Sequence, residues 1–402
     1  MPRFDPFAGV RYDLDRVDLD DVVAPPYDVI GPDAQTELEA RSPYNVVHVD
    51  LARPEPGVDR YTVAGRRFED WLAQGILRTD PEPGFYAYRM GYHDPDGHSR
   101  QIAGVLGALE VSPPGEGAVL PHEETQHKVR DDRLNLLRAC RADLSPVWGL
   151  SMADGLTELV TPSGPPTARC TDEEGVHHRL WRLTRPGLVE AVQATVASAP
   201  VVIADGHHRY ATALQFRREQ RAARGGAAGD DDLILALVCE LADGQAGVRP
   251  IHRVISGLPA GFDLVGALEK HFEPVAARPP VAGLPERMEA EGALGLLLPG
   301  EVLMLLRPRQ EVAVHGEGGR PDAALLDDAL AGLPAHTLAF DHSLDSVAAQ
   351  VASGAASAAV LLRPVAVDQI AGTARSGRRM PTKTTFFHPK PRTGMVFRRL
   401  AG

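Results

Sequence analysis

Cysteine is scarce in this 402-residue sequence, which contains only Cys140, Cys170 and Cys239. The three residues lie far apart and form no CxxC pair, which argues against a zinc ribbon and a disulfide framework. Long apolar runs are also missing, and the N-terminus has neither the basic nor the apolar region of a secretion signal. We therefore expect a cytoplasmic protein with no membrane partner.

Basic residues are fewer than acidic ones. Lysine and arginine total 42 against 54 aspartates and glutamates, which gives a formal net charge of −12. Proteins that bind DNA without sequence preference neutralise many phosphates, so this balance argues against DNA as a partner. The sequence is 44% hydrophobic and 24% charged, a globular composition. Its length is sufficient for about two or three domains.

The first half of the chain mixes strand and helix patterns. Residues 45–54 alternate like a strand, and residues 60–76 carry the spacing of an amphipathic helix. Two β-rich runs around an Asp-Pro-Asp-Gly turn predict a hairpin over residues 84–111. Asp131 and Asp132 are expected to cap the helix that follows them.

The second half continues the mixture, and the whole predicts an α+β fold. The expected elements are a strand and helix over 201–226, two strands about a turn over 231–255, a helix at 262–272, a strand pair about Pro299 and Gly300, a helix at 343–353 and a strand at 358–364.

One stretch, VVIADGHHRYATAL, places five chemically versatile residues at a single chain reversal. They are Asp205, Gly206, His207, His208 and Arg209. The first N–H groups of a helix lack intrahelical partners and carry positive partial charge, so such a turn binds phosphate readily. Arg209 can clamp a phosphate, and the histidines can move protons. Asp205 is suited to hold Mg²⁺ or accept a proton, unless it only caps the helix.

These residues resemble the DGHHR signature of the ParB/sulfiredoxin-like fold, found in nucleotide-binding ParB domains and in free-serine kinases. The wider pattern resembles the bacterial domain-of-unknown-function 1015 family. Its further motifs occur in order along the chain as APPYDVI at 24–30, HEET at 122–125, DDRLNLL at 131–137, RPIHRV at 249–254 and MPTKTTFFHPK at 380–390. The resemblance implies an elaborated ParB/sulfiredoxin-like core over 1–255. It also implies a C-terminal α/β portion, 256–402, that returns the last motif to the site.

The relationship to free-serine kinases implies a small-molecule kinase. It would use ATP, or ADP, with Mg²⁺ to phosphorylate the hydroxyl of a free amino acid, L-serine first. Phosphoryl transfer requires cations, a carboxylate and an oriented nucleophile, and the motifs supply these residue types. The expected catalytic residues are Asp205, Glu123, His207 and His208, of which Asp205 and Glu123 also hold the metal. Nucleotide binding is expected from Gly206, Arg209, His252, Arg253, Lys383, Thr384, Thr385 and Lys390. Substrate binding is expected from Tyr27, Asp28, His122, Glu124 and Thr125.

The C-terminal motif allows two interpretations. Lys383 and the threonines after it resemble the end of a P-loop, but the glycines of that loop are absent. In a strand, Lys383, Thr385 and Phe387 share one face, which would line a nucleotide or phosphate pocket. The alternative is a terminal strand whose aromatic side chains pack inward.

Other functions are disfavoured or remain as rivals. His122 and His127 are five residues apart and diverge by about 140° on a helix, which argues against a zinc protease. The strand pattern after Gly225 and the net charge argue against a ParB-type partition protein. A ParB-like nucleotide-binding regulatory module and a simple nucleotide hydrolase remain as alternatives. A homodimer is compatible with the sequence.

Overall fold

The computed structural model describes residues 1–401 except 95–96, 114, 122–126, 243, 246, 278–280, 282, 301, 311–318, 378–379 and 382, with backbone alone at 121 and 127–130. The described residues group into two compact units. Residues 1–121, 127–247 and 389–401 form the first unit, and residues 248–388 form the second. The final segment of the chain therefore belongs with the N-terminal part.

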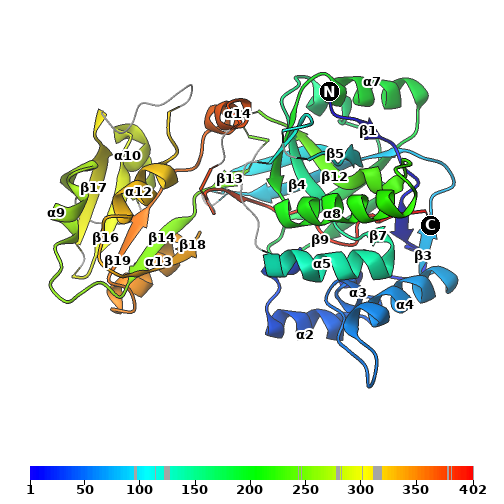
Figure 1. Cartoon of the computed structure of the whole chain (residues 1–402), viewed down its shortest axis with the longest axis horizontal. Helices are drawn as coiled ribbons and strands as arrows, with labels where there is room; N and C mark the ends of the chain where they lie inside the picture. Colours follow the sequence, from blue (N-terminus) through cyan, green and yellow to red (C-terminus); the bar gives the residue numbers. More distant parts are fainter. Residues whose placement is uncertain are drawn as a thin grey trace. The chain divides into compact units, whose positions relative to one another are not determined.

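Among the described residues, the first unit contains a nine-stranded sheet in the order β6-β11-β8-β12-β5-β4-β10-β9, with β1 paired to β5 (Figure 1). Its strands are β1 (Phe4–Asp5), β4 (Phe85–His93), β5 (Ser99–Glu110), β6 (Val119–Pro121), β8 (Val147–Ser151), β9 (Ala168–Thr171), β10 (His177–Leu183), β11 (Val201–Asp205) and β12 (Leu233–Glu240). The predicted hairpin is confirmed, because β4 and β5 pair antiparallel. Strand β11 lies between β6 and β8, so Asp205 ends a strand next to the sheet edge.

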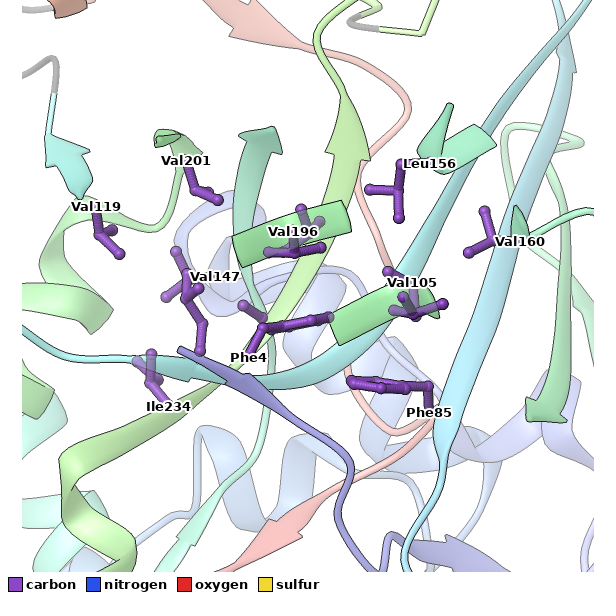
Figure 2. Close-up of a cluster of buried hydrophobic side chains, with 14 of the residues drawn as sticks. Phe4, Phe85, Val105, Val119, Val147, Leu156, Val160, Val196, Val201 and Ile234 are labelled. Carbon is purple, nitrogen blue, oxygen red and sulfur yellow. The ribbon is translucent and has the colours of Figure 1, made fainter. Parts of the chain in front are cut away.

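The helices of the first unit are α1 (Leu19–Val22), α2 (Pro32–Arg41), α3 (Val47–Asp50), α4 (Arg60–Ala73), α5 (His127–Cys140), α6 (Leu156–Leu159), α7 (Pro186–Ala197) and α8 (His207–Ala223), with short 3₁₀ turns at Tyr27–Val29 and Asp230–Asp232. A core cluster joins the sheet to α6, α7 and α8, and Figure 2 shows Phe4, Val147 and Val196 within it. Burial of this apolar surface supplies the main driving force for the unit.

Helices α4, α5 and α8 lie against one another, with α5 in the middle (Figure 1). Leu134 of α5 and Phe216 of α8 share a small core with Leu400 from the C-terminal segment. The approach of α4 to α5 is close, because a Cβ at Gly65 would lie 2.5 Å from the carbonyl oxygen of Ala139. The predicted helix over 60–76 is confirmed by α4, in which Phe68 is fully buried.

The C-terminal segment is built into the first unit. Strand β21 (Arg398–Arg399) pairs with β7 (Ala142–Asp143), and single bridges join Phe397 to Val10 and Thr393 to Ala24. Val10 itself lies in β2 (Val10–Tyr12), which pairs with β3 (Leu77–Thr79). These contacts hold the backbone that follows Lys390 and Arg392 through residues of the same unit.

The second unit is a smaller α/β layer structure. Its described residues contain a six-stranded antiparallel sheet in the order β15-β17-β16-β19-β14-β18. The strands are β14 (His252–Ser256), β15 (Phe272–Ala277), β16 (Leu294–Leu298), β17 (Val302–Pro308), β18 (Thr337–Asp341) and β19 (Ala358–Leu361), and β13 (Val248–Arg249) pairs separately with β20 (Phe386–Phe387). The helices are α9 (Leu264–Leu268), α10 (Leu284–Glu291), α12 (Asp322–Leu330), α13 (Leu344–Ala352) and α14 (Val367–Arg375).

Strand alternation gives this sheet two buried faces. Leu296 and Val360 belong to a core with α9 and α12, whereas their neighbours Leu297 and Leu361 belong to a core with α10 and α13. Successive strand residues point to opposite faces, so one sheet serves both cores. The strand pair about Pro299 and Gly300 and the helix at 343–353 are confirmed as β16–β17 and α13.

Two local predictions are wrong. Residues 45–54 are not a strand, because α3 forms there after the Asn45 side chain accepts a hydrogen bond from Val47 N at 3.0 Å. Asp131 and Asp132 do not cap α5, which already begins at His127. The two strands predicted over 231–255 are confirmed as β12 and β14, which belong to different sheets. No helix in the described part of the chain is long and apolar enough to cross a membrane.

Candidate functional site

The central feature of the first unit is the tight turn from β11 into α8. Asp205 ends the strand, Gly206 has a φ of 89°, and the helix begins at His207. Glycine adopts this left-handed conformation without the strain that a side chain would cause. The arginine of the motif folds back over the turn, since a Cβ at Gly206 would lie 3.0 Å from Arg209 Nη2. The predicted strand, turn and helix are therefore confirmed.

Asp205 joins two cations. Its Oδ1 accepts a hydrogen bond from Lys390 Nζ at 2.7 Å, and its Oδ2 accepts one from Arg209 Nη2 at 2.8 Å. Burial would raise the pKa of Asp205, but Lys390 and Arg209 outweigh it and hold that pKa at about 2. Gly206 is the N-cap of α8, without a side-chain cap bond, so the interpretation of Asp205 as a simple helix cap is wrong.

Arg209 is fixed from a second side. Its Nη1 donates to Ser145 Oγ at 3.2 Å and also to the carbonyl oxygen of Pro146, just before β8. Only 9% of Arg209 is exposed. A buried guanidinium with its hydrogen bonds already made is held in one orientation, which is what stabilisation of developing negative charge requires.

Lys390 lies between two carboxylates. Its Nζ lies close to Asp205 Oδ1 and 3.7 Å from Asp28 Oδ2. Burial would lower the pKa of Lys390, but Asp205 and Asp28 raise it, so the ammonium stays charged. Lys390 was predicted as a nucleotide contact and Asp28 as a substrate contact, and the structure brings them together with Asp205.

The two histidines occupy the first turn of α8. His207 is buried and His208 is half-buried. Burial lowers the pKa of His208, with Asp28 and Asp205 opposing this shift and Arg209 adding to it. We therefore expect a neutral imidazole at pH 7, able to donate one hydrogen bond and accept another.

Tyr27 begins a 3₁₀ turn and lines the same cavity as Arg209. The guanidinium of Arg133 sits over its ring at 4.1 Å, a cation–π contact. Burial raises the pKa of Tyr27 to about 12, against the opposing charges of Arg209 and Arg133, so the hydroxyl stays protonated.

Two residues of this neighbourhood were missed by the sequence analysis. Arg133 donates through Nη1 to Asp50 Oδ1 at 2.8 Å, and both side chains are almost fully buried. Arg133 lies inside the DDRLNLL motif, so the sequence drew attention to this segment but did not predict a role for Arg133 in the site. Asp50 lies within residues 45–54, which were predicted to form a strand, and no local signal connects it with a residue 83 positions away.

Five predicted nucleotide-binding residues lie in the second unit. Arg253 is 1% exposed, and its Nη1 donates to the carbonyl oxygens of Ile251 at 2.9 Å and Lys383 at 3.0 Å. The Nδ1 of His252 accepts from Leu362 N at 3.2 Å, and burial lowers the pKa of His252 to about 4. Thr384 and Thr385 are both buried. The role of these five residues in binding nucleotide stays a prediction.

The prediction that Lys383, Thr385 and Phe387 share one face of a strand is wrong. Strand β20 covers only Phe386 and Phe387, and Lys383 precedes it with a φ of 54°. The ammonium of Lys383 lies 5.1 Å from the ring centroid of Phe340. The inward packing of the aromatic pair is confirmed for Phe387, which is 2% exposed.

The remaining predicted residues, His122, Glu123, Glu124 and Thr125, lie outside the described residues. Among the described ones, no cluster of three or more histidine, cysteine, aspartate or glutamate side chains could hold a metal. Mg²⁺ is commonly held by one or two carboxylates together with substrate phosphates, and each carboxylate oxygen has two lone pairs. Asp205 therefore retains acceptor capacity for Mg²⁺ besides its two ion pairs.

These features define an α+β protein whose first unit places the cationic side chains of Arg209 and Lys390 at a strand-to-helix turn. The chain belongs to the family described as protein of unknown function (DUF1015), whose model matches residues 4–331. The family membership predicted from the motifs is thus confirmed. No curated protein matches the sequence.

Solved structures show distant likeness. A free serine kinase in complex with AMP is 14% identical, with a TM-score of 0.36, over 69% of this chain and 88% of that one. A conserved hypothetical protein from Pyrococcus furiosus is 14% identical, with a TM-score of 0.34, over 68% and 89%. SbnI with C-terminal truncation from Staphylococcus aureus is 11% identical, with a TM-score of 0.37, over 72% and 85%. Similarity at this level carries no argument about function.

Proposed function

We propose that this protein is a small-molecule kinase that transfers a phosphoryl group from ATP, or from ADP, to the hydroxyl of a free amino acid. L-serine is the first candidate acceptor, because the DGHHR motif resembles that of free-serine kinases. The observation that carries the proposal is the pairing of one carboxylate, Asp205, with two cations, Arg209 and Lys390, at the start of a long helix.

This arrangement suits the charge changes of phosphoryl transfer. The acceptor oxygen forms a new bond to phosphorus while the bond to the leaving nucleotide oxygen breaks, and the electron pair of that bond departs with the nucleotide. Arg209, Lys390 and the N–H groups that begin α8 would stabilise the negative charge on the phosphoryl and leaving oxygens. Mg²⁺, which Asp205 would hold, would supply further positive charge at the phosphates.

The hydroxyl proton needs an acceptor within hydrogen-bond reach. Asp205 is a weak base, since its pKa is held at about 2. Of the two roles predicted for Asp205, Mg²⁺ binding and proton acceptance, the low pKa favours Mg²⁺ binding, and Asp205 also aligns the two cations. Glu123 is our candidate base, and the neutral His208 is a candidate partner for the hydroxyl.

The test is turnover of γ-³²P-labelled ATP with a panel of free amino acids, with β-³²P-labelled ADP in parallel. The proposal expects a labelled phospho-amino acid, with L-serine giving the highest yield. Release of inorganic phosphate alone would support a nucleotide hydrolase. Nucleotide binding without consumption would support a regulatory module related to ParB domains. Either result would overturn the kinase.

A further inference from the structure

A cavity of about 50 Å³ lies behind Arg209 in the first unit. Its polar wall includes Tyr27, Asp50, Arg133, Ser145 and Arg209, and leucine side chains of α5 supply part of an apolar wall. The volume holds a few water molecules or the polar end of a small metabolite. Arg209 connects this cavity with the cluster of Asp205, Arg209 and Lys390, because the same guanidinium lines the cavity and pairs with Asp205.

One atom of this wall lacks a hydrogen bond. Asp50 is 3% exposed, and its Oδ1 accepts from Arg133 Nη1 at 2.8 Å. Its Oδ2 is buried and has no hydrogen-bond partner in the described part of the chain. Leaving a buried carboxylate oxygen without a donor is costly, and nearly all such atoms in proteins are satisfied. Burial also raises the pKa of Asp50, although Arg133 and Arg209 oppose the shift, so a further cation beside this carboxylate would stabilise its charged form.

The guanidinium groups of the same wall already donate to protein oxygens. Arg133 uses Nη1 on Asp50 Oδ1, Nη2 on the Asp50 carbonyl and Asp132, and Nε on Asp132. Arg209 uses Nη1 on Ser145 and Pro146 and Nη2 on Asp205. A carboxylate or phosphate entering the cavity would therefore find few donors and would face the unsatisfied oxygen of Asp50. A ligand group that brings its own N–H donors would instead satisfy Asp50 Oδ2, which lacks a donor.

The surrounding ion pairs balance in charge. Within the described residues, the cations are Arg60, Arg133, Arg209, Lys390 and Arg398, and the matching carboxylates are Asp28, Asp50, Asp132, Asp143 and Asp205. A ligand without net charge disturbs this balance least. A free amino acid is such a ligand, since its ammonium and carboxylate cancel.

We infer that this cavity binds the ammonium group of a free amino acid, with Asp50 Oδ2 as the acceptor of its N–H donors. The inference rests on the proposed function, in which this amino acid is the phosphoryl acceptor. The amino acid would lie against Arg209 and beside Asp205. The inference assigns a recognition role to Asp50 and makes Arg133 the residue that positions it.

The first experiment measures binding by calorimetry without nucleotide, so that it is independent of phosphoryl transfer. The probes are L-serine, L-threonine, L-homoserine and L-glycerate, in which a hydroxyl replaces the amino group of serine. We expect at least one amino acid to bind and L-glycerate to bind at least tenfold more weakly than L-serine. Equal binding of serine and glycerate, or no binding of any amino acid, would overturn the inference.

The second experiment tests the residues. Asp50→Asn removes the charge that receives the ammonium and should weaken amino-acid binding at least tenfold. Asp132→Asn is the matched control, because it also removes an ion pair from Arg133 but does not line the cavity. If Asp50→Asn does not fold, Ala142→Val decides, since Ala142 lines the cavity and the added methyl groups fill it without a change of charge.

Asp50→Asn and Ala142→Val should bind a fluorescent ATP analogue as the wild type does. Unchanged amino-acid binding in Asp50→Asn and Ala142→Val would place the amino acid elsewhere. A protein that binds the amino acid at Asp50 but never phosphorylates it would leave this inference standing and would reject the kinase. Phosphorylation of L-glycerate at the rate of L-serine would keep the kinase and reject recognition of the ammonium.

Discussion

Lys390 Nζ lies 2.7 Å from Asp205 Oδ1, although 185 positions separate the two residues in the chain. The other oxygen of Asp205 accepts from Arg209 at 2.8 Å. One partly buried carboxylate therefore aligns two cations beside the start of α8. Cations that are aligned before a phosphate arrives need little rearrangement during the reaction, which makes their electrostatic stabilisation effective.

Replacement of Lys390 by methionine removes the ammonium and keeps most of the packing of the stem. We expect Lys390→Met to lower the rate of phosphoryl transfer from ATP to L-serine at least tenfold, about 1.4 kcal/mol of transition-state stabilisation. Lys270→Met is the control, because Lys270 is exposed in the second unit and has no proposed role. A variant that retains the wild-type rate would show that Lys390 does not contact the phosphates.

Arg209 should contribute more than Lys390, because its guanidinium is also fixed by hydrogen bonds to Ser145 Oγ and the carbonyl oxygen of Pro146. We expect Arg209→Ala to weaken nucleotide binding or to lower turnover by roughly 100-fold, since buried charge-assisted hydrogen bonds contribute a few kcal/mol. Arg217→Ala on the same helix removes an ion pair with Asp232 and should leave turnover near the wild-type value.

Circular dichroism must show that Arg209→Ala is folded, since the change also frees Ser145 Oγ and the carbonyl of Pro146. A folded Arg209→Ala protein with full activity would contradict a phosphate role for this turn.

The local part of the site could be predicted from the sequence, and its long-range part could not. An apolar run, a glycine and an alanine-rich helix pattern determine the turn at Gly206, because each signal lies within a few residues. The pairs Asp205–Lys390 and Asp50–Arg133 depend on the packing of distant segments. The same reason explains the error at residues 45–54, where the buried side chain of Asn45 donates to the carbonyl of Asp21 at 2.7 Å and forms part of a packed helix start.

The two carboxylates assigned to catalysis should respond differently to substitution by amides. Glu123→Gln removes the candidate base, and we expect turnover to fall at least about 100-fold with nucleotide affinity near that of the wild type. Asp205→Asn removes the partner of both cations, so we expect weaker nucleotide and Mg²⁺ binding together with lower turnover. Titration of nucleotide and Mg²⁺ in each variant separates the two roles. Normal turnover and normal metal dependence in both variants would show that the assignments are wrong.

Asp205 should also link stability to pH. Its folded pKa of about 2 lies below the usual value of about 3.9. A group with a depressed folded pKa stabilises the protein above the unfolded pKa, and this contribution is lost as the pH falls through the folded pKa. Asp205→Asn should therefore flatten the fall in the free energy of unfolding between about pH 4 and pH 2. Urea unfolding of both proteins across this range measures the effect, and parallel curves would contradict it.

Lys383 belongs to the C-terminal motif MPTKTTFFHPK, which runs from the second unit into the first. It has a φ of 54°, a strained value for a residue that is not glycine, and such strain often persists at functional positions. We expect Lys383→Met to keep a near-native melting temperature and to lower phosphoryl transfer at least tenfold.

Lys383→Gly makes this test independent of folding. Glycine relieves the strain at positive φ, so this variant should be at least as stable as the wild type while it still lacks the ammonium. If both variants lose activity, the charge of Lys383 acts in the reaction or in nucleotide binding. If Lys383→Gly is stable and fully active, Lys383 serves only the packing against Phe340, and within this motif the catalytic contribution belongs to Lys390.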